Sequence, residues 1–87
     1  MNQIKPTGQE RVNYYLNKAL FYINKLKFLE TKPQTSLSQK SINSLNLKIS
    51  NIKKKLVFLS TKARDKITKF YASNALKEIA QKIKKIQ

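Results

Sequence analysis

The most regular feature of this 87-residue sequence is a row of aliphatic residues in its second half. They recur at alternating spacings of three and four residues, which places them on one face of an α-helix. The row consists of Ile42, Leu45, Ile49, Ile52, Leu56 and Leu59. It predicts a helix over residues 39–59, with Ser38 as its N-cap, whose apolar face must be covered by another helix.

A similar row precedes it. Thr7 and Glu10 have the spacing of a capping box, and apolar residues follow at spacings of three and four from Val12 to Leu26. This pattern predicts a helix over residues 8–30. Pro33 disfavours helix just before it, so residues 31–38 are expected to form a loop. Two amphipathic helices joined by so short a loop pack as an antiparallel hairpin.

A third helix is predicted over residues 62–86, with Ser60 and Thr61 available to cap it. One apolar stripe comprises Ala72, Leu76, Ile79, Ile83 and Ile86, and a second patch of Ile67, Phe70 and Tyr71 is slightly out of phase with it. A kink near residues 73–74 would reconcile the two. The expected fold is one all-α domain, an antiparallel hairpin with a third helix that either packs on it or projects from it.

The charge of the chain indicates its partner. Nineteen Lys and Arg residues face four Asp and Glu residues, for a net charge of +15. Self-repulsion at this charge opposes folding of a small domain, and a polyanion would reverse that effect. Only Arg11 and Arg64 are arginines. Because Lys suits phosphate and Arg is the usual reader of base edges, we expect recognition of a nucleic-acid backbone.

The residues expected to contact RNA lie in the first helix, in a run of lysines in the second, and around the start of the third. They are Arg11, Lys18, Lys25, Lys40, Lys53, Lys54, Lys55, Lys62, Arg64, Lys66 and Lys69. The alternative is that these lysines simply solvate exposed helix faces, but a solvated face normally mixes both signs of charge. Lysines 82, 84 and 85 would also complement the dipole of a helix C-terminus.

Aromatic residues are concentrated in the first helix, at positions 14, 15, 21, 22 and 28. Aromatic side chains at helical spacing usually belong to a core, so burial is the expectation here. Stacking on bases is the alternative, because lysines are interleaved with the rings. Tyr14, Phe21 and Phe28 lie on a different face from the aliphatic row. The first helix is therefore expected to pack on the third helix or on a partner as well as on the second.

Several functions are disfavoured. The chain has no His, no Cys and one Gly, so the usual catalytic bases, soft metal ligands and phosphate-binding glycine loops are missing. We expect no enzyme, no cofactor, no metal and no small-molecule substrate. No apolar run is long enough to span a membrane, and the first ten residues do not resemble a signal or transit peptide. The expected location is the bacterial cytoplasm or an organelle that encodes the protein, a mitochondrion or plastid.

Two segments resemble the large-subunit ribosomal protein twenty-nine family. Residues 26–28, Leu-Lys-Phe, and residues 49–53, Ile-Ser-Asn-Ile-Lys, are similar to the end of that family's first helix and to its I-A-R-I-K signature. The resemblance covers about residues 7–59 and implies an rRNA-binding helical hairpin. The family's paired arginines before the signature are absent, since Asn46, Leu47 and Lys48 stand there.

Other segments resemble the small-subunit ribosomal protein fifteen family. Residues 7–13 look like its T-G-S-x-E-V-Q segment, and residues 37–39 and 56–60 resemble later stretches. That family reads an rRNA junction with a loop that bears His and Asp. This chain has no His, and no Asp between Thr31 and Ser41.

Together these features predict a structural ribosomal protein that binds rRNA through a lysine-rich surface and contacts neighbouring ribosomal proteins. The alternative is a small helical subunit of another, organellar, protein assembly. A third interpretation, an amphipathic protein on an anionic membrane surface, is disfavoured because the polar face of the second helix is richer in Asn and Ser than in Lys.

Overall fold

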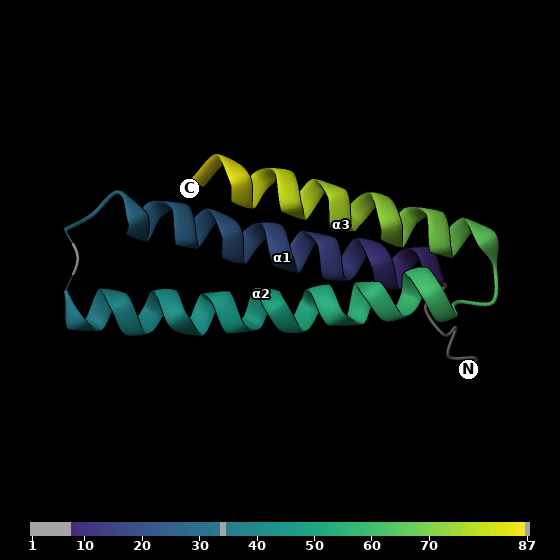
Figure 1. Cartoon of the computed structure of the whole chain (residues 1–87), viewed down its shortest axis with the longest axis horizontal. Coiled ribbons are helices and arrows are strands. Elements are labelled where there is room, and N and C mark those ends of the chain that lie inside the picture. Colours follow the sequence, from purple (N-terminus) through teal and green to yellow (C-terminus); the bar gives the residue numbers. More distant parts are fainter. Residues whose placement is uncertain (1–7, 34, 87) are drawn as a thin grey trace, which may run out of the picture.

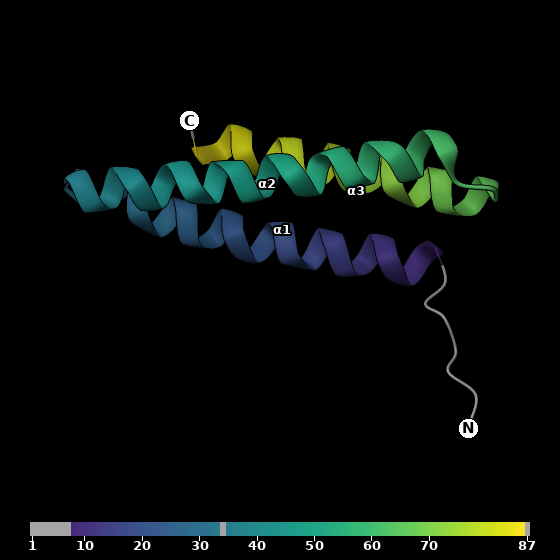
Figure 2. The same ribbon diagram turned by 90° about the horizontal axis from the view of Figure 1, so that it is seen from below.

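A computed structural model describes residues 8–33 and 35–86 and contains three α-helices, α1 (Gly8–Glu30), α2 (Ser36–Lys62) and α3 (Lys66–Ile86). The chain runs up, down and up again, so α2 is antiparallel to both of its neighbours (Figures 1 and 2). Each helix contacts the other two. The described residues form no strand. The predicted all-α fold is confirmed, and α3 packs on the hairpin of α1 and α2.

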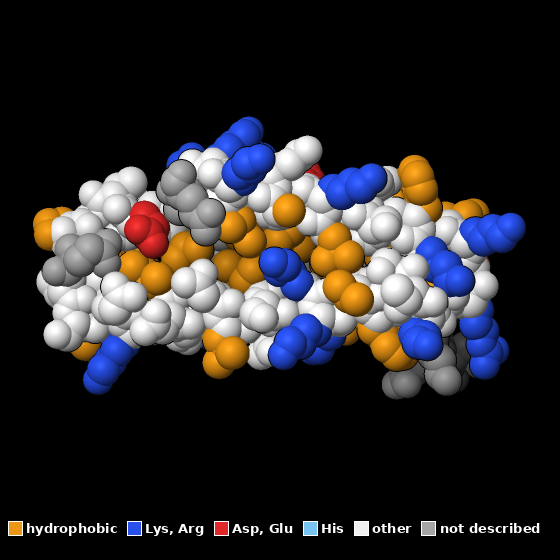
Figure 3. All heavy atoms as spheres, in the orientation of Figure 1, with side chains coloured by type: hydrophobic (Ala, Val, Ile, Leu, Met, Phe, Trp, Pro, Cys, Tyr) orange, Lys and Arg blue, Asp and Glu red, His pale blue; other side chains and the backbone are white. Residues whose placement is uncertain are grey.

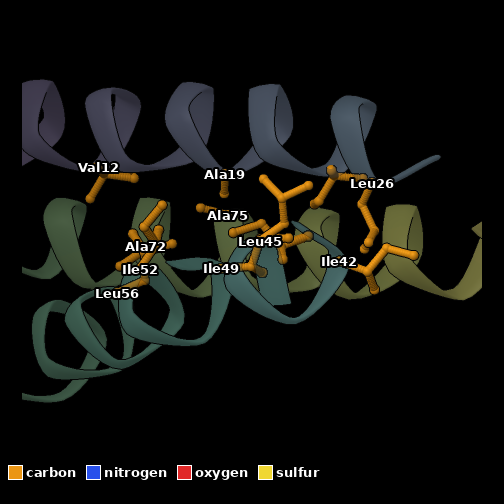
Figure 4. Packing of buried hydrophobic residues seen from close by; sticks show 12 residues of the cluster. Val12, Ala19, Leu26, Ile42, Leu45, Ile49, Ile52, Leu56, Ala72 and Ala75 are labelled. Atoms are coloured by element: carbon orange, nitrogen blue, oxygen red, sulfur yellow. The ribbon is translucent and has the colours of Figure 1, made fainter. Parts of the chain in front are cut away.

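The core lies along the line where the three helices meet. Five residues of the predicted aliphatic row of α2 are buried, and Leu59 packs against them partly exposed. Figure 4 shows side chains from all three helices pointing toward one another. The buried hydrophobic residues are Val12, Ala19, Ile23, Leu26, Ile42, Leu45, Ile49, Ile52, Leu56, Ala72, Ala75 and Ile79. Three of them are alanines, which lets the helix backbones approach closely.

Helix α2 extends beyond the predicted range of 39–59 at both ends. Its N-cap is Thr35, whose hydroxyl accepts a hydrogen bond of 3.1 Å from the backbone N–H of Ser38. Ser38, the predicted N-cap, therefore lies in the first turn. At the other end the hydroxyls of Ser60 and Thr61 donate to the carbonyl oxygen of Val57, at 2.8 and 3.0 Å. Both bonds lie within α2, so neither residue caps α3.

Helix α3 begins at Lys66, four residues later than predicted. Ala63 turns the chain with extended backbone angles, and the carbonyl oxygen of Asp65 accepts the first hydrogen bond of α3 from Lys69 at 3.3 Å. The helix then continues without a break through residues 73 and 74. The out-of-phase patch at Ile67, Phe70 and Tyr71 is exposed, so no kink is needed to bury it. The predicted capping residue Thr7 and the side chain of Ile86 lie outside the described residues.

The first turns of α1 and α3 meet in a close contact. Gly8 faces the buried side chain of Thr68, and a Cβ atom at position 8 would overlap both Oγ1 and Cγ2 of that threonine. Glycine is required here for space, since no positive φ is found among the described residues. The contact brings the first turns of α1 and α3 close together.

We predict that Gly8→Ala destabilises the protein by about 1–3 kcal/mol, the usual cost of forcing extra volume into a packed site. Urea denaturation measures the change, and Gln9→Ala, at an exposed neighbour, is the control. In the double variant with Thr68→Ala, the loss should be smaller than the sum of the two single losses, because the two nearest of the overlapping atoms, Oγ1 and Cγ2, are removed. Strict additivity would contradict this contact.

Thr68 offers a second test. Its Oγ1 atom is buried and makes no hydrogen bond within the described chain. Thr68→Val replaces this hydroxyl by a methyl group of similar size, so we predict a gain in stability of about 1 kcal/mol in thermal or urea unfolding. A loss of stability would show that the hydroxyl has a partner in solution.

Candidate nucleic-acid interface

One exposed side of α1 alternates cationic and aromatic residues. They follow one another at spacings of three and four, so those within α1 lie on a single face of the helix, and the last of them follows two residues after its end. We call this row the aromatic–lysine stripe, and it consists of Arg11, Tyr14, Lys18, Phe21, Lys25, Phe28 and Lys32. Its three rings are more than half exposed, at 56, 54 and 59% for Tyr14, Phe21 and Phe28.

The ammonium group of a lysine lies over each ring of the stripe, and this lysine comes four residues after the ring in the sequence. The ammonium nitrogen lies 5.4 Å from the ring centroid of Tyr14 for Lys18, and 4.5 Å from that of Phe21 for Lys25. At the end of the helix the Nζ atom of Lys32 lies 4.2 Å from the ring centroid of Phe28. All three pairs are within the range of a cation–π interaction. The same contact is thus repeated every seven residues.

Lysines of α2 reach across to the same side of α1. The Nζ atom of Lys48 lies 5.4 Å from the ring centroid of Tyr22, and that of Lys55 lies 5.4 Å from that of Tyr15. Tyr15 and Tyr22 are half-buried, and each touches the stripe ring that precedes it, with centroids 5.5 and 5.9 Å apart. The two helices therefore keep the same register at two contacts one heptad apart and bring cations from both to one surface.

A groove opens between the stripe and α2. It has a volume of about 750 Å³. Phe21, Lys25 and Phe28 line it from α1, and Ser41, Ser44 and Lys48 line it from α2. Two aromatic rings, two ammonium groups and two hydroxyls thus surround one open space. This combination can take a flat, apolar group that carries negative charge at its edge.

One cation of the stripe, Lys18, has a raised pKa because of its contacts with neighbouring tyrosines. Lys18 Nζ donates a hydrogen bond of 3.3 Å to Tyr14 Oη, and this bond is the main reason that the pKa of Lys18 lies above its ordinary value of 10.5. Electrostatic interactions with Tyr14 and Tyr22 raise the pKa of Lys18 further. Lys18 is therefore a permanent positive charge near neutral pH.

The structure gathers some of the residues predicted to bind RNA and separates others. Arg11, Lys18 and Lys25 lie on the stripe, and Lys55 reaches it from α2. Lys62 follows Lys55 by seven residues, on the same side of α2. The others lie elsewhere. Lys53 and Lys54 point about 200° and 100° around α2 from Lys55, and Lys40 comes just before Ser41, the first groove residue of α2. The remaining three belong to the α2–α3 turn and the start of α3: Arg64, Lys66 and Lys69.

The expected burial of the aromatic residues is wrong for the stripe. Helical spacing shows that Tyr14, Phe21 and Phe28 share a face, but the opposite side of α1 already faces both other helices. Lys32 and Lys48 were not among the predicted residues. A heptad repeat in the sequence would have indicated the stripe: residues 14–18 read YYLNK, 21–25 read FYINK and 28–32 read FLETK.

The described residues hold no cluster of metal-ligating side chains. None of the described helices is long and apolar enough to cross a membrane. No family model, curated protein or solved structure matches the chain. The candidate interface is therefore inferred from the geometry of the stripe and the groove.

We predict that Tyr14→Phe lowers the pKa of Lys18 toward its ordinary value, because the substitution removes the phenol that accepts its hydrogen bond. The side-chain carbon resonances of Lys18, followed by NMR as pH is raised, measure the change. Phe28→Leu, at the far end of the stripe, is the control and should leave the Lys18 titration in place. An unaltered titration in Tyr14→Phe would show that the bond does not persist in solution.

Proposed function

We propose that this chain is a structural ribosomal protein that binds rRNA through its lysine-rich surface, and that it works in the ribosome of an organelle or of a bacterial cytoplasm. In this role it holds RNA segments in place and transforms nothing. The observation that carries the proposal is the convergence of cations from α1 and α2 on one surface. The resemblance of several sequence segments to two ribosomal families supports the same function.

The electrostatics of the surface support an RNA ligand. The sequence has no Asp or Glu from Arg11 to Leu29 or from Thr31 to Arg64, so no carboxylate of these segments neutralises the lysines. The lysine and arginine side chains described here are exposed, apart from the half-buried Lys69. On the face of Figure 3 they stand at intervals from one end of the molecule to the other, while acidic side chains are few. A phosphate backbone complements such a surface.

A neutral partner would leave this charge uncompensated. Each lysine that meets a phosphate releases a condensed counterion, so binding gains entropy that falls away as salt rises. The predominance of lysine over arginine favours contacts to phosphate over reading of base edges. We therefore expect recognition of RNA shape and backbone.

We predict that affinity for rRNA fragments falls steeply between 50 and 200 mM salt. For six to ten phosphate contacts the loss is about 10³–10⁵-fold on duplex DNA and somewhat less on single strands. Filter binding at several salt concentrations measures the slope of log affinity against log salt. Affinity that is independent of salt would contradict the proposal.

The position of the interface is tested by two variants of equal charge. Lys18→Gln/Lys25→Gln/Lys55→Gln removes cations of the candidate interface, and Lys77→Gln/Lys82→Gln/Lys84→Gln removes three exposed cations of α3. The first should reduce the salt slope by about 2–3, close to one for each lost phosphate contact. The second should reduce it less. Equal reductions would show that the charge acts diffusely and that the interface is misplaced.

A second candidate, a helical subunit of another protein assembly, is favoured by the exposed apolar side chains of Ile67, Phe70 and Tyr71 at the start of α3. The same side chains would contact neighbouring proteins in a ribosome. Sedimentation of the native protein separates the two candidates. Recovery with ribosomal particles and release by high salt support the ribosome, whereas recovery with a nuclease-resistant complex supports the other assembly.

A further inference from the structure

We propose that the aromatic–lysine stripe binds unpaired nucleotides of RNA, with bases stacked on Tyr14, Phe21 and Phe28 and their phosphates held by the lysines of the stripe and of α2. This inference rests on the proposed function and makes it more specific, because it names single-stranded RNA as the ligand of this surface. The observation behind it is three half-exposed rings, each paired with a lysine, repeated every seven residues.

The spacing of the rings determines how a strand can lie on them. Seven residues of α-helix span about 10.5 Å, whereas stacked bases follow one another at about 3.4 Å. A single base is therefore too thin to be sandwiched between two successive rings. Each ring takes a base of its own, and the backbone between two such bases passes the lysines. Bases in a duplex are already stacked on each other, so only unpaired nucleotides can bind in this way.

The lysines have two positions available to them. In the free protein Lys25 lies over Phe21 and Lys32 lies over Phe28, where each covers an exposed ring. Their flexible stems allow the ammonium group to leave the ring and pair with a phosphate when a base stacks there. The exchange replaces one contact of the cation with a stronger ion pair and covers the ring with a larger flat group.

The groove adds a place for one nucleotide. Its volume is about 750 Å³, and Phe21, Phe28, Lys25 and Lys48 are among the residues that line it. The hydroxyls of Ser41 and Ser44 line the side that belongs to α2. A base on either ring would find hydrogen-bonding groups at its edge and cations within reach of its phosphate. These hydroxyls would gain nothing from a lipid chain.

A second copy of this chain does not fit the stripe. Cations alternate with the rings from Arg11 to Lys32, and the sequence has no carboxylate between Arg11 and Leu29 to pair with the lysines of another copy. Two such surfaces, each on a chain of net charge +15, would repel one another. Only an anionic partner with flat apolar groups complements both features.

The test compares two pairs of exposed aromatic residues. Phe21→Ala/Phe28→Ala removes two rings of the stripe, which are 54 and 59% exposed, and Phe70→Ala/Tyr71→Ala removes two rings of α3, which are 63 and 45% exposed. The ligands are a labelled RNA of about 12 unpaired nucleotides and a duplex RNA of the same length, followed by fluorescence anisotropy. Circular dichroism of each variant checks that the helices are retained.

The expected result is a loss of affinity for the single strand of about fivefold or more for each stripe ring removed. Affinity for the duplex should stay the same, and the control pair should bind both RNAs like the unaltered protein. The salt slope of Phe21→Ala/Phe28→Ala should be unchanged, because no phosphate contact is lost. Phe21→Leu/Phe28→Leu keeps an apolar side chain but no ring, and it should lose affinity as well.

Three results would overturn the inference: equal binding by the two alanine pairs, an equal loss for duplex and single strand, or full affinity in the leucine variant. Binding of the same variants to vesicles of phosphatidylcholine and phosphatidylserine is measured as well. If Phe21→Ala/Phe28→Ala lost affinity for these vesicles but not for RNA, the inference would be overturned in favour of a membrane surface. Failure of the proposed function looks different, because the unaltered protein would then bind neither RNA in a salt-dependent way. Ring-independent, salt-dependent binding of both RNAs would leave the proposed function standing.

Discussion

The packing of the aliphatic row of α2 against both other helices is the interaction on which the structure depends. A chain with a net charge of +15 repels itself, and its helices stay together only because burial of apolar surface outweighs that repulsion. Leu56 is fully buried in this contact. Alanines on α1 and α3, at positions 19, 72 and 75, keep the three helix axes close. The charge is thereby confined to the outside.

The regularity of the core is carried through to the surface. Because α1 and α2 meet at heptad spacing, residues seven apart on α1 lie next to residues that are also seven apart on α2. Tyr15 with Lys55 and Tyr22 with Lys48 show this register directly. Any residue type that recurs every seven positions on the outer side of α1 therefore becomes a straight row. The stripe of rings and lysines is a consequence of the same periodicity that builds the core.

The sequence was sufficient for those features that depend on periodicity alone. The spacing of three and four identified the buried face of α2, but the ends of the helix depend on competing hydrogen bonds. Thr35 and Ser38 are both good N-caps, and Thr35 takes the position. The exposure of Phe21 was missed because spacing shows which residues share a face and not which face is covered. Grouping Lys18 with Lys48 requires the register of two helices, which only the packed structure supplies.

The spacing of the stripe lysines limits their mutual repulsion before a ligand binds. Lys18 and Lys25 are seven residues apart, which is about 10.5 Å along the helix. The Debye length at physiological ionic strength is about 8 Å, so neighbouring charges of the row are largely screened from one another. A polyanion that replaces small ions along the row meets evenly spaced charges and releases the ions that screened them. The same spacing that limits repulsion in the free protein thus prepares the surface for a charged strand.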